Sequence, residues 1–475
     1  MNIIRVTFFA LGALVFAASC SKEAAEPSDF DWFDGNIYFR SFLSDVSSSR
    51  AEDMTLDALG SFQVTCFNTG DLNKNNSGFI SPYFEDATFI RSVSPSAGVV
   101  FISSPEEDPR NWPQGGGLLR FFAFSPSRAV MSESLSAIEG LDKSNYLNLI
   151  NASRENDSKV AVDYRLGSIR VNPDISGQFD FVTAETSGER WKDFSNGVDL
   201  AFHHQMAQVE LRAWGASSEY NFEIAGVRIG NPVVEGSFVF FNSSNNDSHW
   251  DLSENPVKDN VEYLYRPGND AGSGDRIFFI NPGEHSSNAS AASIMGRGGC
   301  AMVLPTVSQR WEGLADPNIA DKPYSTDKMY FSVLMRVYDS TEGNQIYPYL
   351  GNPYGMTVIP YAVDQTGLLI SRLYKGDDEN EYFTDPGLTQ PYMIPDGVSI
   401  KEFGWAAVPL DANWEPGKRY VYTLDYSEGI GVHNPDDPIP GKPIVDKASI
   451  SWGVTVDEWD YAVKNDDYDP DIEVP

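Results

Sequence analysis

The chain has 475 residues and a formal net charge of −34 at pH 7. Nucleic acid and anionic membrane surfaces repel so strong a negative charge, which excludes proteins that bind either through basic patches. An apolar content of 41% and an aromatic content of 13% are normal for a globular protein and exclude a disordered acidic tail, and the length allows two or three domains.

The chain begins with the features of a lipoprotein signal peptide over residues 1–19. Arg5 gives a basic start, and the apolar run 8–17 is shorter than the roughly 20 residues that span a bilayer. Small residues then precede Cys20, the pattern of a lipobox. We expect a lipid to be attached to the Cys20 thiol and to be the membrane anchor. An ordinary secretory signal with an incidental cysteine is the alternative.

A tether and a first strand are expected next. Residues 20–35 are mainly polar or acidic and favour a tether. Residues 36–43 form a short run rich in Ile, Tyr and Phe, which predicts a strand that contains Arg40. The polar run 44–50, which ends at Arg50, follows and is expected to be an accessible loop.

The rest of the chain favours an all-β fold. Short runs rich in Val, Ile, Phe, Tyr and Trp are separated about every ten residues by Gly, Pro, Asn, Asp and Ser. Apolar residues alternate in three segments, which predicts sandwich strands with one face in the core and one in water: Val209, Leu211 and Ala213; Val333, Met335 and Val337; Ile450, Trp452, Val454 and Val456.

Two β-sandwich domains are expected. We place them at residues 36–197 and 198–475, with the boundary near Gly197. The second domain would end with a Pro-rich, loop-like extension over 428–442 and a terminal strand over 448–456.

The segment around His204 shows a change of apolar periodicity. Phe202, His204 and Met206 share one strand face, whereas Val209 and Leu211 fall on the opposite parity. A β-bulge near residue 207 or 208 would reconcile the two patterns. We interpret His204 as a core or capping histidine that donates to a backbone carbonyl. A metal or catalytic role is the alternative, but no second ligand lies at a useful spacing.

Signals of enzyme chemistry are weak. The sequence has five histidines and lacks the zinc-protease, serine-hydrolase and phosphate-loop motifs, so we expect no enzyme, no metal site and no cofactor. A carboxylate pair for glycoside hydrolysis stays open because acids are abundant. Asp71–Asn75 lacks the later glycine and glutamate of a calcium loop and favours a solvated loop. Cys66 and Cys300 form either one disulfide or two buried thiols.

A series of short motifs, in order along the mature chain, resembles the fimbrillin-like proteins of the Bacteroidetes. The motifs are SRA at 49–51, WP at 112–113, LRFFAFSP at 119–126, LAFHHQMAQV at 200–209, VLP at 303–305, WEPGKRYVY at 414–422 and VTVDEW at 454–459. The polar, acid-containing segment after Cys20 also resembles the surface-export signal of Bacteroidetes lipoproteins.

This resemblance implies two tandem transthyretin-like β-sandwich domains in a subunit of a type V pilus. In that scheme a protease removes the N-terminal segment with its first strand, and a strand from another subunit fills the groove. We expect a trypsin-like cut after Arg50 rather than Arg40. The donated strand would present Ile450, Trp452, Val454 and Val456.

The expected partners are other fimbrial subunits, the outer membrane through the lipid, and host or bacterial surface ligands in adhesion. The expected location is the cell surface. The alternative function is a surface glycan-binding lipoprotein of a polysaccharide-uptake system, which would need an exposed aromatic platform. We expect four tryptophans to lie in the core instead: Trp112, Trp414, Trp452 and Trp459.

Overall fold

A computed structural model describes most of the chain between residues 35 and 458. The described ranges are 35–42, 59–68, 81–94, 98–131, 153–154, 161–241, 247–252, 256–270, 272–310, 328–376, 381–445 and 450–458. The expected all-β class is confirmed in its coarse form, because these ranges are mostly strand and form curled β-sheets. Within them no helix is long and apolar enough to cross a membrane.

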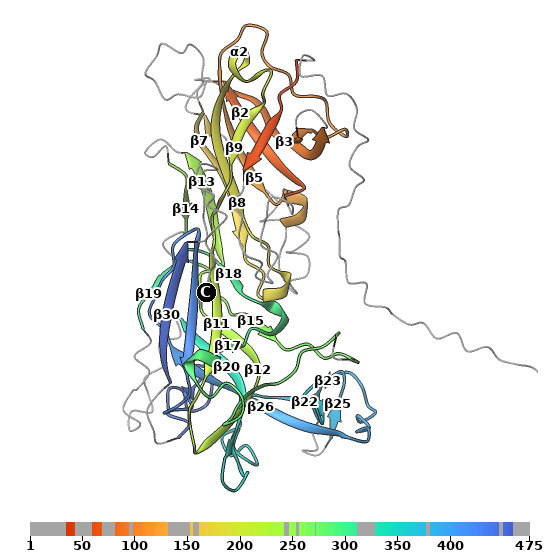
Figure 1. Ribbon diagram of the computed structural model, residues 1–475, viewed down its shortest axis with the longest axis vertical. Helices are drawn as coiled ribbons and strands as arrows, with labels where there is room; N and C mark the ends of the chain where they lie inside the picture. The colour runs from red at the N-terminus through yellow and green to blue at the C-terminus, as the bar shows by residue number, and fades with distance from the viewer. Residues whose placement is uncertain are drawn as a thin grey trace, which may run out of the picture.

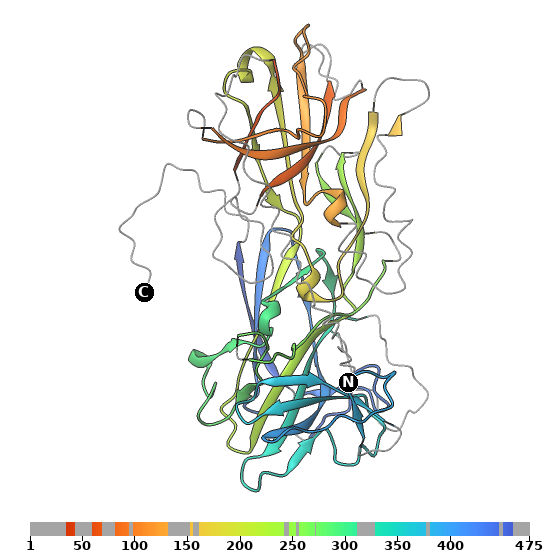
Figure 2. The same ribbon diagram turned by 90° about the vertical axis from the view of Figure 1, so that its right-hand side faces the viewer.

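The molecule is elongated, with the first strands at one end and most of the C-terminal strands at the other (Figures 1 and 2). The helical elements with described bounds are short: α2 (Arg190–Asp193) and the 3-10 turns η2 (Ile175–Gly177), η3 (Asn288–Ser290) and η4 (Gly296–Gly298). The sheets therefore determine the shape.

The N-terminal end is one eight-stranded sheet, counted over the described residues. In spatial order its strands are β10 (His203–His204), β8 (Val182–Glu189), β5 (Leu118–Ser125), β2 (Ser61–Asn68), β3 (Ser81–Ser94), β4 (Gly98–Ser103), β1 (Phe39–Phe42) and β9 (Val198–Ala201). Phe202 alone separates β9 from β10, so the two ends of this order are joined in sequence and the sheet curls.

A second sheet packs on the N-terminal one. Its strands are β14 (His249–Asp251), β13 (Glu235–Phe241), β7 (Ala161–Arg170) and β6 (Ser153–Arg154). The ring of Phe122 on β5 lies 5.7 Å from that of Tyr164 and 5.4 Å from that of Phe240. Aromatic packing of this kind joins the outer face of the first sheet to the core of the C-terminal half.

The C-terminal half contains two further sheets and two short ribbons. One sheet has β15 (Val261–Leu264), β12 (Tyr220–Gly230), β20 (Tyr330–Asp339), β26 (Val398–Pro409), β22 (Val358–Asp364) and β23 (Leu369–Arg372), with β16 (Phe278–Ile280), β21 (Gln345–Tyr347) and β29 (Val432–His433) beside it. The other has β17 (Ala292–Ser293), β11 (Ala207–Trp214), β28 (Lys418–Asp425) and β30 (Ser451–Glu458), with β18 (Ala301–Val303) on β11. The ribbons pair β19 (Val307–Ser308) with β27 (Ala412–Asn413), and β24 (Tyr374–Lys375) with β25 (Tyr382–Phe383).

The predicted strands exist, but two of them differ in burial from the expectation. The alternating residues of β11 and β20 were expected to leave one face in water. In β20, Val333 and Val337 are buried, and so are Leu334 and Arg336 between them. β20 is a central strand between β12 and β26, and side chains on both of its faces are buried.

The chain passes from the first sheet to the C-terminal ones at Gln205 and Met206. The strands that follow Gly197, β9 and β10, still belong to the N-terminal sheet, and β11 starts the next one. The change of parity after His204 therefore marks a change of sheet, and the pairing of residues 207–209 with β18 and β28 runs without the expected bulge. The two-domain division stays a prediction, and the strand pairing favours a boundary closer to Gln205 than to Gly197.

Candidate functional site

The first strand lies between two other strands. The predicted strand at 36–43 is confirmed at its centre as β1, Phe39–Phe42. On one side Phe39 pairs with Phe101 of β4, antiparallel. On the other side all four residues of β1 pair in parallel with β9, from Val198 to Ala201. Removal of β1 would therefore leave the edges of β4 and β9 without their partner.

The side chains of this segment are part of the N-terminal core. Ile37 and Phe39 are fully buried. The Phe39 ring lies 4.7 Å from that of Phe89, 5.1 Å from that of Phe121 and 5.9 Å from that of Phe62. If this strand left, the gap would be lined by aromatic rings, and such a surface is costly in water.

The residues before β1 pair with a loop that follows β4. The Ile37 amide donates to the carbonyl of Arg110 at 2.7 Å, and the Trp112 amide donates to the carbonyl of Gly35 at 3.0 Å. Gly35 has a φ of +92°, which glycine adopts without the strain of a Cβ. The segment is thus held against the loop from Ser103 to Asn111.

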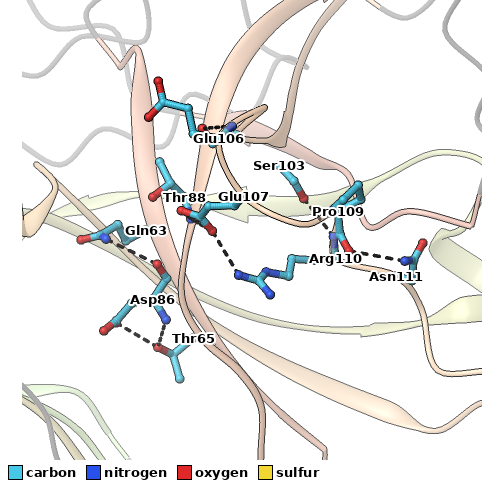
Figure 3. Close-up of polar contacts among 11 residues, drawn as sticks. Gln63, Thr65, Asp86, Thr88, Ser103, Glu106, Glu107, Pro109, Arg110 and Asn111 are labelled. Atoms are coloured by element: carbon cyan, nitrogen blue, oxygen red, sulfur yellow. Dashed lines mark hydrogen bonds and ion pairs between the residues drawn. The ribbon is translucent and has the colours of Figure 1, made fainter.

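The loop from Ser103 to Asn111 is stabilised by contacts that do not involve β1 (Figure 3). The Arg110 amide donates to the Ser103 hydroxyl at 3.1 Å, and the Arg110 guanidinium donates to the Glu107 carboxylate at 3.1 Å. The same carboxylate accepts the Thr88 amide of β3 at 3.1 Å. This wall of the β1 site is therefore built from β3, β4 and the loop itself.

Asp86 lies in the same part of the sheet, at an irregularity between β2 and β3 (Figure 3). Its φ is +50°, and its amide donates to the Thr65 hydroxyl at 3.1 Å. The Arg128 guanidinium donates to its carboxylate at 2.9 Å. Burial raises the pKa of Asp86, and the Arg128 charge opposes that shift.

The two candidate cleavage arginines differ in placement. Arg40 lies inside β1, where it is paired with Asp199 in the β-ladder, and its guanidinium lies 2.7 Å from the Asp199 carboxylate. A backbone paired in this way is a poor protease substrate. Arg50 lies outside the described residues, as do Cys20, the signal peptide 1–19 and the predicted tether up to residue 34.

The last strand, β30, lies at the edge of its sheet, on the outer side of the molecule (Figure 1). It pairs with β28 along its whole length, from Ser451 to Glu458. Its apolar face is only half covered. Ile450, just before the strand, is buried and Trp452 is half-buried, whereas Val454 is 43% and Val456 is 51% exposed. Open edges with exposed apolar residues favour pairing with another strand.

The Pro-rich segment before β30 differs from the expected free extension. Val432 and His433 form β29 and pair with β26. Ile430 and Asn434 are also buried. The four residues 446–449 just before Ile450 lie outside the described ones. The segment is anchored because its apolar residues pack on the nine-stranded sheet.

His204 is buried, as expected. Its Nδ1 lies 2.6 Å from the carboxylate of buried Asp180, which is a side-chain partner, whereas the sequence suggested a backbone carbonyl. Within the described ranges, no group of three or more His, Cys, Asp or Glu side chains lies close enough together to hold a metal ion.

The two remaining cysteines are buried, and of the tryptophans expected in the core two are buried and Trp452 is half-buried. Cys66 and Cys300 are buried in different clusters and are not joined in a disulfide, and burial raises the pKa of the Cys66 thiol. Trp112 and Trp414 are buried, as expected. Trp459 lies outside the described residues.

Sequence comparison decides the family. The model of the fimbrillin-like family matches residues 49–288, slightly more than half of the chain. The chain belongs to the fimbrillin-like family. The matched region begins at the SRA motif, so the resemblance found in the short motifs is confirmed. No curated protein matches the sequence.

Solved structures similar to this fimbrillin-like chain share little sequence with it. A candidate cell adhesion protein from Bacteroides uniformis is 11% identical, over 90% of this chain and 99% of that one, with a TM-score of 0.32. One from Bacteroides eggerthii is 11% identical over 90% and 98%, with a TM-score of 0.35. The fimbrial anchor protein Mfa2 from Porphyromonas gingivalis is 10% identical over 89% and 97%, with a TM-score of 0.24. Because all three TM-scores are below 0.5, the family assignment rests on the match to the family's sequence model alone.

Sequence reasoning missed the partners of the first strand. The β9 strand pairs with β1 in parallel, although the two lie far apart in the chain. No local feature of the sequence predicts such pairing. The Glu107–Arg110 contact that fixes the neighbouring loop was missed for another reason: it looks like any other pair of surface charges in the sequence.

Proposed function

We propose that this chain is a surface-exposed fimbrial subunit that assembles by protease-triggered strand exchange and supports adhesion. The observation that carries the proposal is the position of β1. It fills the gap between β4 and β9 and supplies a ring to the N-terminal core. Membership of the fimbrillin-like family supports the same function.

In this proposal the precursor is a lipoprotein. Cys20 carries the lipid and holds the chain at the outer membrane, and export brings it to the cell surface. The chain acts without enzymatic chemistry, and its partners are other fimbrial subunits and surface ligands. Two tandem sandwich domains of transthyretin-like topology complete the proposed architecture.

A cut after Arg50 would separate the lipid and β1 from the rest of the chain. The vacated groove would keep one wall in place, since the Arg110 loop is tied to Thr88 and Ser103. A preformed groove binds a strand at lower entropic cost than one that must be ordered first. A donated strand would restore the ladder hydrogen bonds of β4 and β9.

The strand β30 is the proposed donor. It lies at a sheet edge, and Val454 and Val456 are exposed in its present place, so little apolar burial is lost when that end leaves. The cost of leaving lies mainly at Ile450 and Trp452, which pack against the core. If β30 inserted between β4 and β9 of another subunit, its alternating apolar face would be covered there.

Cells that express the wild type, Arg50→Ala, Arg40→Ala or a chain truncated before residue 448 test the proposal. N-terminal sequencing of shed surface material should begin at Ala51 for the wild type and for Arg40→Ala. Electron microscopy should show polymers for these two and none for the other two. Polymers formed equally well by Arg50→Ala and by the truncated chain would overturn strand exchange through these segments.

A further inference from the structure

A second feature lies in the C-terminal half: a cavity of about 710 Å³ beside β12, β15 and the β22–β23 hairpin. Its volume falls in the range of small-molecule sites. Polar and charged side chains line much of it, among them Asn172, Asn260, Glu262 and Arg372. Neither β1 nor β30 contributes a lining residue, so the cavity is independent of the proposed strand exchange.

The carboxylates of this cavity already have partners. Each lies within 3.1 Å of an arginine: Glu262 with Arg228, Asp174 with Arg266, and Asp259 with Arg170. These ion pairs reduce the negative charge of the carboxylates but do not remove it. The carboxylates keep lone pairs that can accept hydrogen bonds from hydroxyl groups of a ligand.

Arg372 is different from these arginines. Over the described residues it has no ion pair with a carboxylate, and its buried Nε lacks a hydrogen-bond partner. Its guanidinium lies 5.5 Å from the centre of the Tyr374 ring, which leaves the planar fork of donors available. A guanidinium keeps its charge at all ordinary pH values, so this is a fixed cation in a strongly acidic chain.

Tyr361 lies directly across from Arg372 in the β22–β23 ladder, so both side chains are on one face of the sheet. It lines the cavity and is fully buried, and its hydroxyl has no hydrogen-bond partner in the described structure. A buried polar group without a partner is destabilising, and a ligand that accepts its hydrogen bond would remove that penalty. Burial also raises the pKa of Tyr361, so the hydroxyl keeps its proton as a donor.

We propose that this cavity binds an acidic sugar, with Arg372 and Tyr361 recognising its carboxylate. A carboxylate matches the planar fork of a guanidinium, and such charged hydrogen bonds are among the strongest in proteins. The amides of Asn172 and Asn260 and the paired carboxylates would receive the sugar hydroxyls. A phosphate is disfavoured because its second negative charge would face Asp174, Asp259 and Glu262.

The test uses the full chain from residue 21 and three probes: methyl β-D-glucuronide, methyl β-D-glucoside and glucose 6-phosphate. Binding is followed by NMR titration. We expect saturable binding of the glucuronide, and binding of the other two weaker by about tenfold or more. Arg372→Gln should weaken glucuronide binding by about tenfold, and Tyr361→Phe should weaken it less.

Arg276→Gln is the matched control, because Arg276 lines a neighbouring cavity and donates to Thr366. It should leave glucuronide binding unchanged. If Arg372→Gln does not fold, Arg372→Lys keeps the charge without the planar fork and should still weaken binding severalfold. The proposal is overturned if the glucuronide does not bind, if it binds no better than either other probe, or if a folded Arg372 variant binds it as well as the wild type.

Discussion

Phe39→Ala tests whether the first strand is a structural part of the N-terminal core. The side chain is fully buried, and its ring lies within 6 Å of three other aromatic rings. Removing such a ring from a packed core costs about 3–5 kcal/mol in the free energy of unfolding. For a domain of roughly 150–250 residues, a loss of that size corresponds to a fall in melting temperature of roughly 6–20 °C.

The assay is thermal and urea unfolding of the uncut chain from residue 21, followed by near-UV circular dichroism. Arg40→Ala, on the same strand, is the control. Its ion pair with Asp199 joins side chains that are 41% and 56% exposed, so its loss should cost at most about 1 kcal/mol. If Phe39→Ala cost no more than Arg40→Ala, β1 would not be a core strand and the reasoning about the groove would fail.

Three further outcomes follow from the same structure. The two thiols of the chain from residue 21, Cys66 and Cys300, should not react with an aromatic disulfide reagent at neutral pH and should both react after unfolding; a fast-reacting native thiol would contradict their burial. Burial raises the pKa of Asp86 above its ordinary value of 3.8, so the folded chain binds this proton more tightly than the unfolded chain does. The stabilisation from the protonated carboxyl is therefore lost as the pH rises from about 4 through the pKa of the folded chain. The free energy of unfolding of the wild type relative to Asp86→Asn should therefore fall over that pH range, and a constant or rising difference would refute the assignment. Metabolic labelling with an alkyne fatty acid should tag the full-length wild type but not Cys20→Ser, and equal labelling would disprove lipidation.

The sequence predicted strands better than it predicted what surrounds them. The alternation of Ile450, Trp452, Val454 and Val456 marks a strand, and β30 is there. Alternation cannot tell how much of a face is covered, because the covering strands come from elsewhere in the chain. The same limit explains why β20 is buried on both faces although its pattern suggested one.

A shift in apolar periodicity can have more than one structural cause. The shift between Phe202 and Val209 is real, and a bulge would produce it. The chain instead leaves one sheet after β10 and enters another at β11. A change of sheet and a bulge look alike in one sequence, since both reset which face points inward.

The sites were least predictable where distant segments meet. The groove around β1 combines β4 with β9, and the cavity at Arg372 combines a hairpin with the turn near Asn172. Arg372 resembles any other surface arginine in the sequence. Its lack of a carboxylate partner in the described structure is visible only once the strands are paired.

The most direct test of strand exchange follows where β30 lies before and after cleavage. A photo-crosslinking amino acid in place of the exposed Val454 would report its neighbours in the purified chain from residue 21, with mass spectrometry of the products. Before cleavage, crosslinks should join β30 to β28 of the same chain. After cutting at Arg50 and polymerisation, they should join β30 to β4 or β9 of another chain. Polymers in which β30 still crosslinks only to its own β28 would contradict the account.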